Sequence, residues 1–151
     1  MSPRQTQLFA TMLPIAQALQ AKNGEFFPIA AQVNTTGELT HLMAGEEGRE
    51  WSPSSTLLQI LRDNLSQKAH RREILASALV YDTRVRLGGK SETTDAIVLE
   101  LEDSADSAKI VFVPYVRSGA KFKYYPARVE RGTESIFKST PSTSSGDTIL
   151  N

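Results

Sequence analysis

Gly88-Gly89-Lys90-Ser91 is the stretch of this sequence that most resembles a phosphate-binding loop. In such a loop the spacing G-x-x-x-x-G-K-[ST] lets successive backbone amides surround a phosphate, and a helix follows directly. Here Arg84 stands where the first glycine of the pattern belongs, and an alternating strand pattern begins at Asp95 in place of a helix. We therefore predict a turn between two strands, where glycine supplies positive φ, and no bound nucleotide or other cofactor.

Six carboxylates in the second half of the chain are candidates for holding a hard metal ion or for acid and base catalysis. They are Asp82, Asp95, Glu100, Glu102, Asp103 and Asp106. Their spacing matches no known ligand loop, and period-two alternation places them beside Arg84, Arg86 and Lys109 on adjoining strands. We predict cross-strand ion pairs, each worth under about 1 kcal/mol when exposed, and no metal site.

The residue types that carry most covalent chemistry are scarce. There is no cysteine, which excludes disulfides, thiolate metal sites and thiol nucleophiles. His41 and His70 are the only histidines and lack the close spacing of a helical metal-binding pair. No serine stands in a G-x-S-x-G pattern. The sequence thus predicts no catalytic residue and favours a protein that is not an enzyme.

Residues 121–128, KFKYYPAR, interleave basic and aromatic side chains. That pattern would suit a single-stranded nucleic acid, which needs phosphate neutralisation and base stacking. It equally suits an edge strand, where lysines and a proline discourage pairing with other chains. Lys plus Arg equals Asp plus Glu, 17 each, so no overall field attracts nucleic acid, and the edge strand is favoured.

Two helices are predicted to position these segments. Ser2-Pro3-Arg4-Gln5 has the pattern of a capping box, and the helix it begins should end at Asn23-Gly24. One apolar stripe faces the core, made of Leu8, Phe9, Met12, Ala16 and Leu19. A second helix should run from Ser52-Pro53 to residues 70–72.

The rest of the chain is predicted to be strands. A hairpin is expected over 26–33 and 39–43, followed by three strands over 79–87, 95–102 and 109–115, with residues 121–129 as a candidate fourth. Ile97, Leu99 and Leu101 should point inward and Glu100 and Glu102 outward. Residues 74–80 are apolar on both parities, so both faces of that segment should be covered. The fold class is two-layer α+β, with an antiparallel sheet of about five strands, both helices on one face, and the order α-β-β-α-β-β-β.

Length and composition indicate one globular domain. Of 151 residues, 40% are apolar and 23% charged, which is enough to bury a core. Glutamines interrupt the apolar residues of the N-terminal segment, so we expect neither a signal peptide nor a membrane span, and a cytoplasmic location. We predict a domain over 1–136 and a Ser/Thr-rich tail over 137–151.

Two resemblances follow from these segments. FFPIAAQVNTTGEL (26–39) and DAIVLELEDSADSAKIVFVPY (95–115) resemble the hairpin and strand signatures of a family of small, uncharacterised bacterial α+β proteins. That resemblance implies no activity. The order of elements also resembles profilin-like roadblock domains and, less closely, secretion-chaperone folds, which is an argument from topology alone.

The leading hypothesis is a cytoplasmic, non-catalytic protein-binding module that acts as an immunity-type inhibitor, an adaptor or a chaperone-like protein. Its partner would be another protein or a second copy of the chain. Its candidate interaction surface comprises Trp51, Arg84, Arg86, Glu100, Glu102, Lys121, Lys123 and Tyr125. The alternative is a small enzyme or ligand-binding protein, which requires Arg84, Arg86, Glu100 and Glu102 to converge in a pocket. Nucleic-acid binding through residues 121–128 is the third hypothesis.

Overall fold

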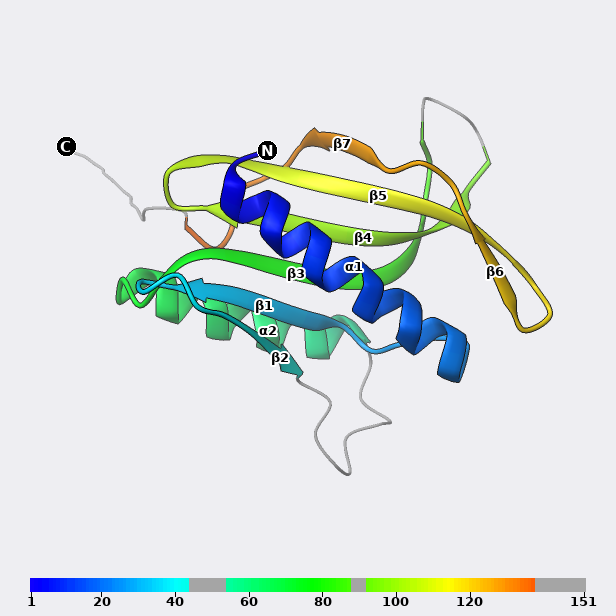
Figure 1. Cartoon of the computed structure of the whole chain (residues 1–151), viewed down its shortest axis with the longest axis horizontal. Coiled ribbons are helices and arrows are strands. Elements are labelled where there is room, and N and C mark those ends of the chain that lie inside the picture. Colours follow the sequence, from blue (N-terminus) through cyan, green and yellow to red (C-terminus); the bar gives the residue numbers. More distant parts are fainter. Residues whose placement is uncertain (44–53, 88–91, 138–151) are drawn as a thin grey trace.

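The computed structural model describes residues 1–43, 54–87 and 92–137 and shows an antiparallel sheet between two helices (Figure 1). The elements in chain order are α1 (Pro3–Asn23), β1 (Ile29–Asn34), β2 (Leu39–Met43), α2 (Ser54–His70), β3 (Ile74–Val85), β4 (Thr94–Asp103), β5 (Asp106–Ser118), β6 (Lys121–Tyr124) and β7 (Arg128–Arg131). The strands lie in the order β2-β1-β3-β4-β5-β6, and β7 also pairs with β5. The turn predicted at 88–91, Trp51 and residues 138–151 of the tail predicted over 137–151 lie outside the described residues.

The α+β class is confirmed, but within the residues that the structure describes the sheet has seven strands and not about five. The single strand predicted over 121–129 is two strands that pair with different parts of β5. β6 pairs with Tyr115 to Ser118, and β7 pairs with Lys109 to Phe112. Pro126 lies between them, where it has no amide to give to a ladder. β6 is the last strand of the main sheet order, so the edge-strand interpretation of this segment holds.

The predicted start and end of α1 are confirmed. The Ser2 hydroxyl accepts from the Gln5 amide at 3.1 Å, and the Gln5 side chain accepts from the Ser2 amide at 2.9 Å. Gly24 ends the helix in the left-handed conformation with φ 81°. Within the described residues, neither helix is long and apolar enough to cross a membrane.

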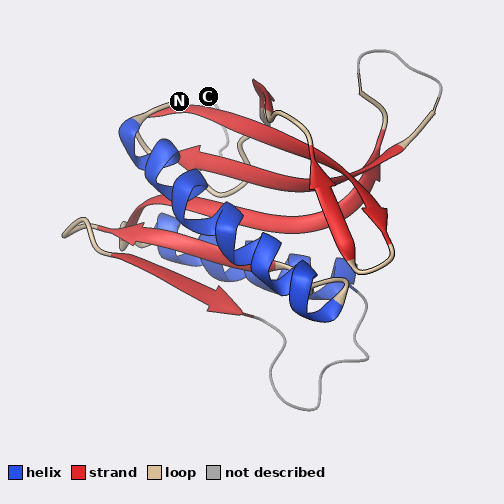
Figure 2. Ribbon diagram, turned by 45° about the vertical axis from the view of Figure 1, so that its right-hand side comes forward, coloured by secondary structure: helices blue, strands red, loops and turns tan. Residues whose placement is uncertain are grey.

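The two helices cover opposite faces of the sheet, so the prediction that both lie on one face is wrong (Figure 2). On β4, Ile97, Leu99 and Leu101 pack in the core under α1. On β3, Leu79 packs with α2. The register explains the error, because Leu79 pairs with Glu100 and therefore shares its face, while Leu99 pairs with Val80. We call the two sides the α1 face and the α2 face.

The prediction that both faces of residues 74–80 are covered is confirmed, because neighbouring residues of β3 belong to different cores. Ala76, Ala78 and Val80 pack under α1. Leu79 packs against Leu61 and Leu65 of α2. Burial on both sides is what a continuous apolar strand requires.

After β7 the chain crosses back over the sheet on the α2 face. The Gly132 amide donates to the Ala108 carbonyl at 3.0 Å. A Cβ at this position would lie 3.0 Å from the Lys109 carbonyl carbon, so only glycine fits without a backbone shift. Further on, Ile136 is buried against α2 and Phe137 is partly buried beside it. Residues 132–137, which we call the crossing segment, thus help α2 to cover the sheet.

The start of α1 is fastened to the turn between β4 and β5. The carboxylate of Asp103 accepts from the Ser2 hydroxyl at 2.6 Å and from Arg4 at 2.9 Å. It also accepts from the Ala105 amide at 2.9 Å. Burial alone would raise the pKa of Asp103, but these hydrogen bonds and the Arg4 charge hold it below its ordinary value.

Candidate functional site

Polar side chains converge in two places that lie on opposite faces of the sheet. The first is on the α2 face and comprises Arg62, Tyr81, Glu100, Glu102 and Ser135. We call it the Glu102 clamp. The second is on the α1 face, where α1 ends beside β3, β5 and β6, and we call it the Asp82 cleft. It is lined by Gly24, Glu25, Phe26, Ser54, Asp82, Thr83, Arg84, Asp95, Tyr115, Arg117 and Phe122.

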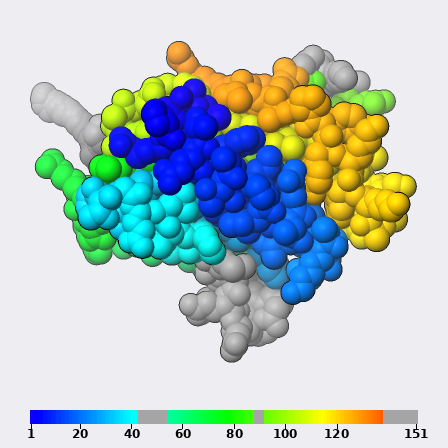
Figure 3. Space-filling model, viewed as in Figure 1, coloured from blue at the N-terminus to red at the C-terminus, as the bar shows by residue number. Residues whose placement is uncertain are grey.

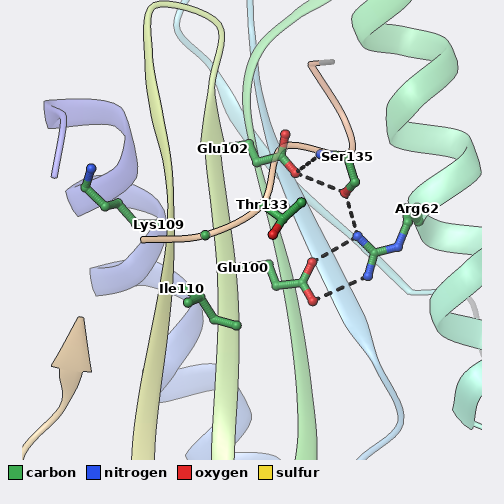
Figure 4. Close-up of a pocket in the computed structure, with 8 residues that line it drawn as sticks. Arg62, Glu100, Glu102, Lys109, Ile110, Thr133 and Ser135 are labelled. Atoms are coloured by element: carbon green, nitrogen blue, oxygen red, sulfur yellow. Dashed lines mark hydrogen bonds and ion pairs between the residues drawn. The ribbon is translucent and has the colours of Figure 1, made fainter. Parts of the chain in front are cut away.

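In the Glu102 clamp, an ion pair joins α2 to β4 (Figure 4). The two guanidinium nitrogens of Arg62 donate to the two oxygens of Glu100 at 2.9 and 3.4 Å. The Tyr81 hydroxyl donates to the same carboxylate at 2.6 Å. Arg62 also donates to the Ser135 hydroxyl at 2.6 Å. Every polar group of this set therefore has a partner within the chain.

Glu102 is buried, and its carboxylate holds the crossing segment by its backbone. It accepts from the amides of Ser135, Ile136 and Phe137 at 3.0 to 3.2 Å. The Ser135 hydroxyl donates to it at 3.1 Å. A carboxylate that accepts several amides satisfies donors that would otherwise be buried without partners. The role of Glu102 is to fix the chain in place.

The electrostatics of the clamp agree with a structural role. Burial, reinforced by the hydrogen bond to Glu100, raises the pKa of Tyr81 far above its usual range, so its hydroxyl stays a donor. Burial alone would lower the pKa of Arg62, but Glu100 raises it above its ordinary value. A cavity of about 270 Å³ lies beside these groups, yet their hydrogen-bonding capacity is directed at one another.

The charged residues that the sequence grouped together are divided by the sheet. On the α1 face, Arg84 of β3 forms an ion pair of 3.2 Å with Asp95 of β4. The predicted cross-strand ion pair is thus confirmed for these two residues. Glu100 and Glu102 are on the α2 face, and Glu100 pairs with Arg62 of α2 and not with a strand residue. Arg86 is exposed beyond the end of β3. The pocket that the alternative hypothesis requires, in which these four side chains converge, does not form.

Lys109 was also predicted to pair with a carboxylate on an adjoining strand. Its ammonium instead donates to the Ser107 hydroxyl at 2.7 Å. Figure 4 shows its side chain turned away from Glu100 and Glu102. The reason is register, because Lys109 pairs with Leu101 and shares the α1 face with it.

Basic and aromatic residues of β6 are separated in the same way. Lys121 and Lys123 are exposed on the α2 face, where Lys123 lies 5.5 Å from the Tyr125 ring. Phe122 and Tyr124 are partly buried on the α1 face beside Tyr115. Tyr125 therefore shares a surface with the exposed lysines, whereas Phe122 and Tyr124 do not, so the stacking rings and the cations of this segment lie only partly on one face.

The Asp82 cleft has a carboxylate at its base that is held by neutral donors. The Tyr115 hydroxyl donates to Asp82 at 2.6 Å, and the Gln20 amide donates at 3.1 Å. The Tyr124 hydroxyl donates in turn to Gln20. Figure 3 shows how the C-terminal part of α1 comes to lie against the β5–β6 hairpin on this face. A helix and three strands thus position the carboxylate.

The cleft changes the acidity of the groups around it. Burial raises the pKa of Asp82, and the hydrogen bonds from Tyr115 and Gln20 oppose that rise only in part. The negative charges of Asp95 and Glu25 add to it. Burial likewise raises the pKa of Tyr115 and of Tyr124, so both phenols remain protonated. A carboxylate with a raised pKa in a cleft is a common property of functional sites.

Sequence reasoning missed this cleft, although one signal for it was present. Gln20 continues the spacing of Leu8, Met12 and Ala16 along the buried stripe of α1. It is fully buried, as is Gln5 at the other end of the same helix. A glutamine at a core position needs a polar partner, and this one finds Asp82.

Comparison of the chain with protein-family models, with curated proteins and with solved structures found no match. Within residues 1–43, 54–87 and 92–137, no group of three or more His, Cys, Asp or Glu side chains is arranged to hold a metal ion.

Proposed function

We propose that this chain is a non-catalytic protein-binding module that docks a partner protein on the part of the α2 face that α2 does not cover. The supporting observation is the position of α2 on the sheet. In the described part of the chain, α2 packs on β1 and β3, while the α2 face of β5 and β6 extends beyond it. A cytoplasmic location, with a role as an immunity-type inhibitor, adaptor or chaperone, belongs to this proposal.

The uncovered surface is apolar at its centre. Alternate residues of β5 point to the α2 face, because they pair with Glu100, Val98 and Ala96 of β4. Val116 is 51% exposed and Tyr125 is 42% exposed. We call this surface the open sheet face, and it comprises Ile110, Phe112, Pro114, Val116, Lys121, Lys123 and Tyr125. Contiguous exposed apolar surface with a polar border is typical of protein interfaces.

The charge at the border indicates the partner's chemistry. Lys121 and Lys123 lie on the same side as Val116, and both are exposed. Neither forms a salt bridge within the described residues. The complementary surface is therefore apolar with acidic residues around it, and association should weaken as salt rises.

The test compares two matched variants. Val116→Glu places a charge on the open sheet face, and Val129→Glu places the same charge on the α1 face at a residue that is 50% exposed. A partner recovered from the native host with the wild-type chain is purified, and its affinity for each variant is measured at low and high salt. We expect at least tenfold weaker binding for Val116→Glu, little change for Val129→Glu, and a loss of affinity with salt.

Equal affinity of the two variants for every recovered partner would overturn the proposal. Light scattering supplies a second readout. A homodimer that Val116→Glu dissociates and Val129→Glu does not would assign the open sheet face to a second copy, and so overturn the assignment to a different protein.

A further inference from the structure

The Asp82 cleft adjoins an apolar hollow, and the two share part of their lining. The cleft has a volume of about 360 Å³. The hollow has a volume of about 260 Å³ and is lined by Leu19, Asn23, Glu25, Phe26, Phe27, Pro28 and Ser54. Glu25, Phe26 and Ser54 border both. A small-molecule site usually combines apolar walls with polar groups that fix the ligand's orientation.

The hydrogen-bond partners of Asp82 differ from those of the other inward-facing carboxylates of the described chain. Asp103 has Arg4, Glu100 has Arg62, and Glu102 has three backbone amides. Asp82 has one phenol and one amide from side chains, both neutral. Each of its oxygens accepts a single one of these bonds and retains capacity for another. It is the carboxylate that a cationic donor would satisfy.

The two cations that border the cleft are already engaged. Arg84 pairs with Asp95 and its side chain is 74% exposed. Arg117 donates to the carbonyls of Gly119 and Gly24 at 2.9 and 3.4 Å. It also lies 5.4 Å from the centre of the Phe122 ring. Arg84 offsets the charge of Asp95, whereas the carbonyls that Arg117 contacts leave its charge in place, so the described lining carries Asp82 and Glu25 against one guanidinium.

Aromatic rings form part of the wall. The ring centroids of Tyr115 and Phe122 lie 5.5 Å apart, and Phe26 lines both the cleft and the apolar hollow. Ring faces attract organic cations, and they do so best where water is partly excluded. The combination of a carboxylate, aromatic walls and an apolar extension suits an amine with a hydrocarbon body.

We propose that the Asp82 cleft binds a small organic ammonium ion, with the ammonium group hydrogen-bonded to Asp82 and its apolar body in the hollow lined by Leu19, Phe26 and Phe27. This site lies on the α1 face and does not depend on the open sheet face. Its occupation would also relieve the unfavourable burial of the Asp82 charge, because a bound cation favours the ionised form.

The experiment uses phenethylamine as the probe, with phenethyl alcohol as a neutral isostere and phenylacetate as an anion. Binding to the full chain is measured by calorimetry and by NMR shifts at pH 7. We expect saturable binding of the amine and affinity at least tenfold lower for the alcohol and the anion, because a charged hydrogen bond contributes about a factor of ten or more. Asp82→Asn should reduce amine affinity by about tenfold or more.

Asp106→Asn is the matched control, since it makes the same change at an exposed carboxylate away from the cleft. It should leave amine affinity within about twofold of wild type, because distant charges are screened. Unfolding curves establish that both variants are folded. Amine and alcohol binding equally well, no saturable amine binding, or an unchanged affinity in folded Asp82→Asn would each overturn the proposal.

Discussion

The Glu102 clamp and the Asp82 cleft contain similar side chains and use them in opposite ways. In the clamp, Glu100 meets a guanidinium and a phenol, and Glu102 meets three amides and a hydroxyl. In the cleft, the carboxylate of Asp82 accepts from a phenol and an amide side chain. The first arrangement completes the hydrogen bonding of its members. In the second, no salt bridge to Asp82 forms among residues 1–43, 54–87 and 92–137.

This difference separates buried charge that stabilises the fold from buried charge that is available for binding. A buried carboxylate costs free energy unless hydrogen bonds or an opposite charge offset the lost hydration. The clamp offsets that cost and fastens residues far apart in the sequence. The cleft offsets that cost incompletely, and we propose that a bound ligand supplies the missing compensation.

The largest effect is expected from Glu102→Ala. The substitution leaves the amides of Ser135, Ile136 and Phe137 without their acceptor, and each unsatisfied buried donor costs about 1 to 3 kcal/mol. We expect the free energy of unfolding in urea to fall by about 3 kcal/mol or more.

Glu130→Ala, an exposed glutamate of β7, is the control and should change stability by less than about 0.5 kcal/mol. If Glu102→Ala were as stable as this control, the crossing segment would not depend on the clamp. The contrast between the Glu102 clamp and the Asp82 cleft would then no longer support our interpretation of the cleft.

The features of the fold that could be predicted from the sequence are those that depend on residues close together in the chain. The capping box at Ser2 and the glycine at the end of α1 depend on neighbours in sequence, and both were predicted correctly. The face on which each strand residue lies depends on register between strands. Alternation gives two sets of residues per strand but does not say which set of β3 shares a face with which set of β4. Both helices were therefore assigned to one face.

The same limit explains the site residues. Asp82 and Glu100 were both recognised as charged strand residues, but their partners come from α1, α2, β3 and β5. Those contacts link residues 19 to 62 positions apart in the sequence. No local spacing encodes them. Gln20 was the exception, since a polar residue within an apolar stripe indicates that a partner exists without identifying it.

A smaller effect, with a defined pH dependence, is expected from Asp103→Asn. The pKa of Asp103 is lowered in the folded chain, so its contribution to stability is present above the ordinary aspartate pKa of about 4 and is lost as pH falls through the folded value. At pH 7 the variant should be less stable by about 1 to 2 kcal/mol, because the ion pair with Arg4 is partly buried.

Urea unfolding of wild type and Asp103→Asn between pH 3 and pH 7 measures this. The difference in stability should shrink as the carboxyl of the wild type becomes protonated at the acidic end. A difference that stays constant over the range would mean that the hydrogen-bond geometry, and not the charge of Asp103, makes the contribution.

The smallest effect, and one of opposite sign, is expected from Asp82→Asn. The pKa of Asp82 is raised, so the folded chain holds its proton more tightly than the unfolded chain does. Its contribution to stability is complete below the ordinary aspartate pKa of about 4 and is lost as pH rises through the folded value. Wild type should therefore lose stability relative to Asp82→Asn as pH rises through that window, and at pH 7 the variant should be as stable or more stable, by less than about 1 kcal/mol.

The groups that face Asp82 do not change this sign. Tyr115 and Tyr124 stay protonated throughout. The negative charges of Asp95 and Glu25 disfavour ionisation of Asp82. Arg84 and Arg117 are the cationic residues that border the cleft within the described chain. Repeating the pH series with saturating phenethylamine should abolish the decline, because the bound cation stabilises the ionised carboxylate. If wild type instead gained stability over Asp82→Asn as pH rose without the amine, Asp82 would behave like Asp103, and the cleft would be a second clamp.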